Sequence, residues 1–111
     1  ISGFGFFYMS YGLDLGSSLE INDVDLSTLT NGTYTGTYRS GRWTNTVKVI
    51  IKDHRISDIE IVDDILFSQP AVLDKILDRV INKQRVKVDV ISEATVTSKA
   101  YLKAIELALV E

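Results

Sequence analysis

The chain has 111 residues, of which 45% are hydrophobic, and this length and composition fit one domain with its own apolar core. A net charge of −3, with acidic and basic residues intermixed, argues against a surface for nucleic acid. The absence of cysteine excludes disulfides, thiolate catalysis and cysteine-ligated clusters, so redox chemistry requires another cofactor. We therefore predict no nucleic-acid partner. We also predict no metal site, because the single histidine, His54, has no nearby cluster of carboxylates in the sequence.

The first 30 residues are predicted to form an N-terminal arm. Residues 1–15 are rich in Phe, Tyr, Gly and Leu, yet they fall short of the ~20 residues with which a helix spans a bilayer. Residues 1–38 contain no Lys or Arg, which is typical of the non-cytoplasmic flank of a membrane anchor. Two interpretations stay open: the arm is the end of a membrane anchor, or it packs on the domain. The domain itself is predicted to span residues 31–111.

A first strand is predicted over residues 33–38, after a turn at residues 31–32. Tyr34 and Tyr38 share one face of this strand. Gly36 lies between them and leaves room for a neighbouring chain or a ligand to come close.

Two further strands are predicted to complete a meander. Residues 43–52 alternate apolar and polar side chains, as in a half-buried strand. Residues 53–54 predict a tight turn, and residues 55–62 predict the third strand. The change of phase between Ile56 and Ile59 indicates either a bulge in this third strand or a later start of the strand.

Two helices and a short fourth strand are predicted in the second half of the chain. Pro70 occupies a first helical position, and apolar residues follow at helical spacing up to residue 81. Residues 86–90 alternate as in a strand, and residues 100–109 carry the apolar stripe of a last helix. The predicted fold class is α+β, a mainly antiparallel sheet with two helices packed on it. The charged residues of the last helix are expected to face water: Lys99, Lys103 and Glu106.

Four hydroxyl residues lie between the predicted fourth strand and the last helix, in residues 92–98. At such a position free backbone N–H groups and the helix dipole favour a phosphate. Ser and Thr are also preferred helix caps, so a plain cap is the alternative interpretation. We expect Thr97 or Ser98 to cap the helix, which leaves the hydroxyl of Thr95, beside the small Ala94, accessible.

The run from Asp89 to Ser98, DVISEATVTS, resembles the motif of the FMN-binding domain family. This family includes covalently flavinylated subunits of sodium-pumping NADH:quinone reductases and of related ferredoxin-linked membrane complexes. Residues 31–38 and the hairpin over residues 43–62 also resemble the family's opening strands, so the resemblance covers roughly residues 31–110. It implies an FMN cofactor joined by a phosphodiester to Thr95, with the C-terminal helix following the attachment motif.

The resemblance also implies an enzyme partner and a set of site residues. Asp89, Ser92 and Ala94 would be recognition residues for a magnesium-dependent flavin transferase that uses FAD as the donor. Thr97 and Ser98 complete the predicted cofactor-binding set. Glu93 stands where the family motif usually has Gly. Non-covalent binding of FMN or of another phosphate-bearing ligand therefore stays open beside covalent attachment.

Other residues are weaker candidates for contact with a flavin. Four aromatic residues are candidates for stacking on the isoalloxazine ring, although such side chains more often belong to a core. Lys99 is a candidate partner for the phosphate. The adjacent carboxylates at residues 63–64 are expected to meet water and not a metal. The aromatic candidates are Tyr34, Tyr38, Trp43 and Phe67.

The sequence predicts an electron-carrier domain and not a complete enzyme. No set of general acid, base and nucleophile is evident in it, and a flavin supplies its own redox chemistry. We expect the domain to be membrane-anchored or exported, outside the cytoplasm, with a tether through the N-terminus and redox proteins of the membrane as partners. A structural interaction domain without flavin is the remaining alternative.

Overall fold

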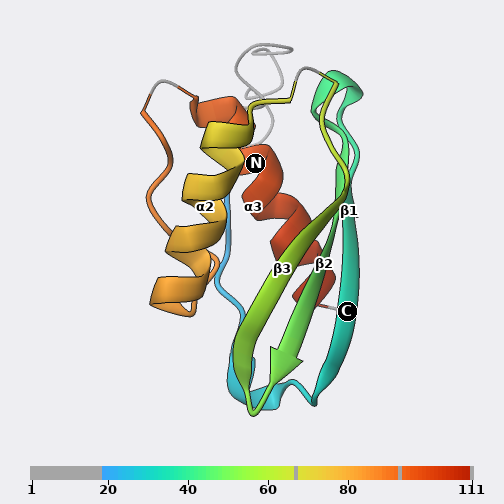
Figure 1. Cartoon of the computed structure of the whole chain (residues 1–111), viewed down its shortest axis with the longest axis vertical. Helices are drawn as coiled ribbons and strands as arrows, with labels where there is room; N and C mark the ends of the chain where they lie inside the picture. Colours follow the sequence, from blue (N-terminus) through green and yellow to red (C-terminus); the bar gives the residue numbers. More distant parts are fainter. Residues whose placement is uncertain (1–18, 67, 93, 111) are drawn as a thin grey trace, which may run out of the picture.

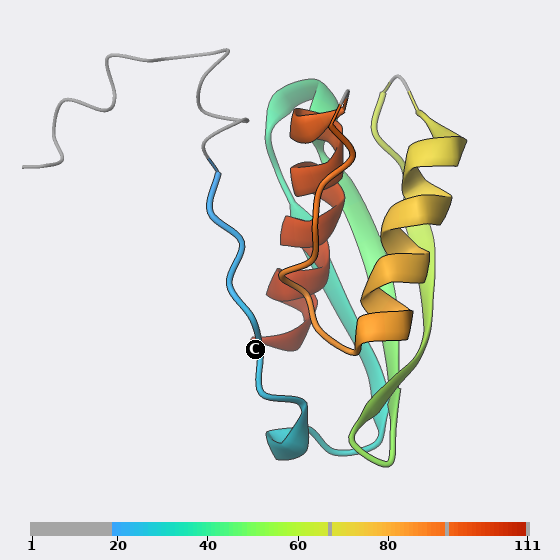
Figure 2. The same ribbon diagram turned by 90° about the vertical axis from the view of Figure 1, so that its left-hand side faces the viewer.

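The computed structural model of the chain describes residues 19–66, 68–92 and 94–110. One layer is a three-stranded antiparallel sheet of order β1-β2-β3, and helices α2 and α3 lie side by side on one of its faces (Figures 1 and 2). This arrangement confirms the α+β class. The elements in chain order are η3 (Leu26–Thr28), β1 (Gly32–Tyr38), η4 (Gly41–Trp43), β2 (Asn45–Lys52), β3 (Arg55–Asp63), α2 (Pro70–Lys83) and α3 (Thr95–Leu109).

The predicted close approach at Gly36 is confirmed, and the neighbour is α3. A Cβ atom on Gly36 would lie 2.6 Å from the Cα of Ala108, and it would also meet the backbone nitrogen of Ala108 and the backbone oxygen of Ala104. These are backbone atoms that cannot rotate away. Glycine on β1 and alanine on α3 together allow the helix to lie directly on the strand.

The hairpin of β2 and β3 follows the predicted pattern with one exception at its start. Asp53 and His54 form the turn with positive φ angles of 54° and 63°. Of the two alternatives for β3 the bulge is confirmed, because the strand begins at Arg55 and the register steps from the pair Ile51–Ile56 to the pair Ile50–Asp58. The strand prediction from residue 43 was wrong, since Trp43 belongs to the turn of η4 and β2 begins at Asn45.

The two helices enclose the core against the sheet. Helix α2 begins at Pro70, as predicted, and turns Leu73, Ile76 and Val80 inward. Helix α3 packs on β1 and β2 and also contacts α2, so most of its circumference is covered. Its fully buried residues include Tyr101, Leu102 and Ile105.

The fourth strand predicted over residues 86–90 does not form. Several of its backbone groups bond to side chains, and Val88 N donates to the carbonyl oxygen of Val86 at 2.8 Å within the segment. The N–H groups of Val86 and Lys87 donate to Asp23 Oδ1 at 3.0 and 2.8 Å. Arg79 donates from Nη1 to the carbonyl oxygen of Asp89 at 2.7 Å. The segment is therefore held as an irregular connection between α2 and α3.

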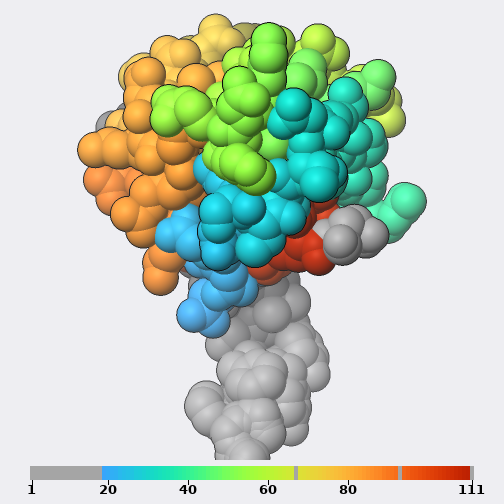
Figure 3. Space-filling view, turned by 90° about the horizontal axis from the view of Figure 1, so that it is seen from below, coloured from blue at the N-terminus to red at the C-terminus, as the bar shows by residue number. Residues whose placement is uncertain are grey.

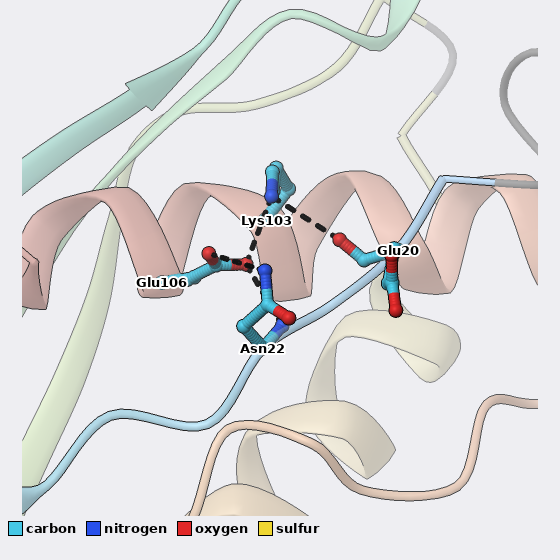
Figure 4. Close-up of polar contacts among 4 residues, drawn as sticks. All are labelled: Glu20, Asn22, Lys103 and Glu106. Atoms are coloured by element: carbon cyan, nitrogen blue, oxygen red, sulfur yellow. Dashed lines mark hydrogen bonds and ion pairs between the residues drawn. The ribbon is translucent and has the colours of Figure 1, made fainter. Parts of the chain in front are cut away.

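The part of the arm that the structure describes lies along α3. Ile21 is buried in the core, and Asn22 donates from its backbone N to Glu106 Oε1 at 3.1 Å. Lys103 Nζ donates to the same oxygen at 3.0 Å and to the carbonyl oxygen of Glu20 at 3.2 Å (Figure 4). In the space-filling view the arm (blue) fills the surface between the connection before α3 (orange) and the end of α3 (red) (Figure 3).

This contact overturns the prediction that Glu106 faces water. Only 6% of Glu106 is exposed, because the arm covers this side of α3. Its charge is compensated by Lys103, four-fifths of whose side chain is itself buried. Among the described residues no helix is both long and apolar enough to cross a membrane.

Candidate functional site

A cavity of about 520 Å³ opens at the first turn of α3. Its volume falls in the range of about 300–1,000 Å³ that is usual for small-molecule sites. One wall comes from α3 and the residues before it, a second from η4, and a third from the connection between β3 and α2. The lining residues are Arg42, Trp43, Ile65, Gln69, Ser92, Ala94, Thr95, Val96 and Thr97.

The sheet topology explains why these three segments meet. Because β2 and β3 are antiparallel, the residues before β2 and the residues after β3 lie at the same end of the sheet. Leu66 N donates to the carbonyl oxygen of Arg42 at 2.9 Å and joins the two segments there. Helix α3 begins at this same end, the upper end in Figure 1. Residues distant in sequence therefore line one cavity.

The first turn of α3 presents backbone donors to the cavity. The first intrahelical bond runs from Ser98 N to the carbonyl oxygen of Ala94 at 2.8 Å. The N–H groups of Thr95, Val96 and Thr97 precede this bond, so no helix carbonyl is available to them. The cap residue, Ala94, has no side-chain acceptor. Such a helix start is suited to a phosphate, through both its donors and the helix dipole.

The prediction that Thr97 or Ser98 caps the helix was wrong. The backbone turns back before these residues, with Ala94 N bonded to the carbonyl oxygen of Ile91 at 2.8 Å, so the helix begins at Thr95. Ser98 is fully buried, and its Oγ accepts a hydrogen bond from Ile91 N at 3.1 Å. Its hydroxyl holds the preceding loop against the helix.

The structure brings together four of the six predicted cofactor-binding residues. Ser92, Ala94, Thr95 and Thr97 line the cavity, and Ser98 lies behind its wall. Asp89 is set apart and lines a second cavity of about 310 Å³. That second cavity is otherwise lined by Arg79, Lys83, Arg85, Lys87 and Val88. Glu93 lies outside the described residues.

Among the described aromatic candidates, Trp43 is the one that lines the cavity. The guanidinium of Arg42 lies 4.4 Å from the centre of its ring, in a cation–π contact. Tyr34 is engaged elsewhere, since its hydroxyl donates to the carbonyl oxygen of Thr30 at 2.7 Å, and Tyr38 packs partly buried against the core. Phe67 lies outside the described residues. Lys99 is half-buried on α3 and is not among the lining residues.

Sequence reasoning did not identify Arg42, Ile65 or Gln69 as site residues. The residues lie in connections without a motif, far in sequence from Thr95. The predicted topology could have indicated two of the three segments. In an antiparallel meander, the residues before the second strand lie beside the residues after the third strand. Adding the start of the last helix to that end requires the tertiary packing of α3.

A family model for the FMN-binding domain matches residues 41–110. The chain belongs to the FMN-binding domain family. The match includes every residue that lines the cavity at the start of α3. A comparison with curated proteins gives no match. FMN is accordingly the cofactor of this domain.

The residues of the cavity fit the two parts of FMN. The uncapped first turn of α3 supplies donors for the phosphate. Trp43 and Ile65 supply an aromatic and an apolar surface for the isoalloxazine ring. Ser92, Thr95 and Thr97, which carry hydroxyl groups, also line the cavity.

Proposed function

We propose that this domain is an electron carrier whose FMN is attached through a phosphodiester to Thr95. One observation carries the proposal: Thr95 is the first residue of α3, half-buried, and it lines a cavity at an uncapped helix start. Its hydroxyl is thus near the backbone donors that favour a phosphate. When bound, FMN supplies the redox chemistry, and the protein supplies position and surroundings.

The attachment step balances with FAD as the donor. The Thr95 oxygen attacks the phosphorus on the flavin side of FAD, and the bond to the second phosphate breaks. AMP leaves, and the hydroxyl proton passes to solvent or to a base of the enzyme. We propose that a separate magnesium-dependent flavin transferase performs this step, because the cavity wall offers Thr95 no described carboxylate or imidazole.

We further propose that the domain works outside the cytoplasm, anchored or exported, and exchanges electrons with redox proteins of the membrane. The support is in the sequence: residues 1–38 lack Lys and Arg, beside an apolar N-terminal stretch.

The walls formed by Trp43 and Ile65 would orient the flavin ring and exclude water from one of its faces.

A second candidate is non-covalent binding of FMN in the same cavity. Glu93 favours it, because glutamate replaces the usual glycine beside the attachment residues. A glutamate adds bulk and a negative charge near an anionic phosphate.

Intact mass separates the two candidates after co-expression with a flavin transferase and an adequate FAD supply. We expect an FMN-sized increase in the unaltered chain and in Thr95→Ser, which keeps a hydroxyl, and no increase in Thr95→Ala. An adduct that persists in Thr95→Ala would refute Thr95 as the acceptor. If only Glu93→Gly gains the adduct, then Glu93 blocks attachment and the non-covalent candidate takes its place.

A further inference from the structure

Tyr101 is a fully buried residue of α3 that reaches the connection closing the cavity. Its hydroxyl donates a hydrogen bond to Asp64 Oδ1 at 2.5 Å. Helical side chains point back toward the start of their helix, so the ring extends toward the turn where Ala94 and Thr97 line the cavity. The hydroxyl therefore joins α3 to the connection between β3 and α2, behind the cavity wall.

The connection between β3 and α2 meets this hydroxyl at Asp64. Asp64 Oδ1 accepts the hydrogen bond of the phenol, and Ile65 N donates to the same oxygen at 2.7 Å. Ile65, directly after Asp64, lines the cavity, and so does Gln69 farther along the same connection. Leu66 N then binds the carbonyl oxygen of Arg42 and ties the connection to η4. The wall formed by this connection is thus bonded to α3 through the Tyr101 hydroxyl.

This phenol remains a donor at physiological pH. Burial, followed by the hydrogen bond to Asp64 and the charge of that carboxylate, raises the pKa of Tyr101 far above its usual value of 10.0. The contact therefore does not open as pH varies in the physiological range.

We propose that Tyr101 is a positioning residue that sets the separation between the Thr95 wall and the wall formed by Trp43, Ile65 and Gln69, and thereby the affinity and placement of FMN. The inference rests on the proposed binding of FMN in this cavity. Tyr101 is not among the lining residues, so it acts through Asp64 and the connection. A site whose supporting contacts are lost becomes too loose to hold its ligand in one geometry.

The test is a titration of FMN into the full chain produced without a transferase. Flavin fluorescence gives the Kd, and the residual emission of Trp43 at saturation reports how near the flavin lies, because Trp43 is the single tryptophan of the chain. The variants are Tyr101→Phe, Asp64→Ala, the two together, and Asp64→Asn. Tyr34→Phe is the matched control, since it removes a hydroxyl that donates at 2.7 Å to Thr30, away from the cavity.

We expect Tyr101→Phe to raise the Kd about fivefold, which corresponds to one hydrogen bond. Asp64→Ala should raise it at least as much, because Asp64 Oδ1 also accepts a hydrogen bond from Ile65 N at 2.7 Å. The double variant should be no weaker than Asp64→Ala alone, because the phenol acts through this carboxylate. Asp64→Asn keeps an oxygen acceptor and should stay within about twofold of the unaltered chain. Tyr34→Phe should leave the Kd and the Trp43 emission unchanged, whatever it does to the melting temperature.

The outcomes distinguish a failure of the positioning role of Tyr101 from a failure of the proposed function. If the unaltered chain binds FMN and Tyr101→Phe binds it equally well with the same Trp43 emission, the positioning role is refuted. Additive losses in the double variant would also refute it, because the groups would then act independently. If the unaltered chain neither binds nor carries FMN, the proposed function itself fails. Should Tyr101→Phe not fold, Asp64→Ala and Asp64→Asn decide the question, since Asp64 is exposed.

Discussion

The two ends of α3 hold polar groups in opposite ways. At its start the N–H groups precede the first helical bond, the cap is Ala94, and the turn opens into a cavity. In its second half Glu106 is buried and bonded to Asn22 and Lys103 (Figure 4). A helix start whose first N–H groups have no helix carbonyl is suited to a ligand, whereas a buried carboxylate with its partners in place stabilises the fold. The comparison predicts that changes at the two ends separate ligand binding from stability.

The largest effect is expected at Gly36, beneath the second half of α3. In Gly36→Ala the new methyl group would meet backbone atoms of Ala104 and Ala108, so α3 must shift. We expect a loss of about 3 kcal/mol in the free energy of unfolding, measured by urea denaturation. Thr35→Ala, an exposed change on the same strand, should cost less than about 1 kcal/mol. Equal losses in the two variants would contradict the close packing of α3 on β1.

The next largest loss of stability is expected at Glu106, the buried carboxylate in the second half of α3. Glu106→Ala leaves the N–H of Asn22 and the ammonium of Lys103 without their carboxylate partner. We expect the free energy of unfolding to fall by about 2 kcal/mol, with the Kd for FMN unchanged. Glu106→Gln keeps an oxygen for Asn22 and should lose less. A weakening of FMN binding that matches the loss of stability would break the proposed separation of the two ends.

At the cavity beside the start of α3, Trp43→Leu should weaken FMN binding more than it lowers the stability of the fold. It keeps an apolar side chain but removes the aromatic wall of the cavity. We expect the Kd for FMN, measured by flavin fluorescence, to rise about fivefold, which corresponds to about 1 kcal/mol of binding free energy. Tyr38→Leu, at an aromatic residue that does not line the cavity, serves as the control. An unchanged Kd in Trp43→Leu would show that the flavin does not contact Trp43.

The smallest effect concerns the arm and its dependence on pH. Burial alone would raise the pKa of Asp23, but the N–H of Lys87, the guanidinium of Arg85 and the N–H of Val86 outweigh it and hold the pKa below its usual value. A carboxylate of this kind stabilises the fold above its unfolded pKa of about 3.9 and loses that contribution as the pH falls through its folded pKa.

The stability difference between the unaltered chain and Asp23→Asn should therefore be present at pH 7 and shrink below about pH 4. It should stay under about 1 kcal/mol, since 37% of the Asp23 side chain is exposed. Denaturation at a series of pH values measures it. A difference that instead grows toward low pH would show that the arm is not held by the ionised carboxylate.

Local patterns in the sequence predicted the elements whose partners are near in sequence. The meander, its bulge and the start of α2 at Pro70 depend on alternation, turn residues and the fixed φ of proline. Gly36 was also informative, because a glycine within a strand indicates a close neighbour. The motif around Thr95 located one wall of the cavity, at the start of α3.

Local turns shifted the predicted strand start at residue 43 and the predicted helix cap at Thr97 or Ser98. The other failures share a different physical cause, which is contact between segments distant in sequence. Helical periodicity placed Glu106 on the outside of α3, but the arm covers that side. Alternation predicted a strand over residues 86–90, but Asp23 and Arg79 bind its backbone groups instead. Arg42, Ile65 and Gln69 reach the cavity through the packing of the sheet against α3, which no local pattern records.

The emission of Trp43 tests the central claim most directly, which is that FMN lies between Trp43 and the first turn of α3. We would compare the chain before and after loading with FMN, whether by titration or by a flavin transferase. The account predicts strong quenching of the single tryptophan in the loaded protein, since it lines the cavity. Unchanged Trp43 emission in protein that carries FMN would place the flavin elsewhere and contradict the account.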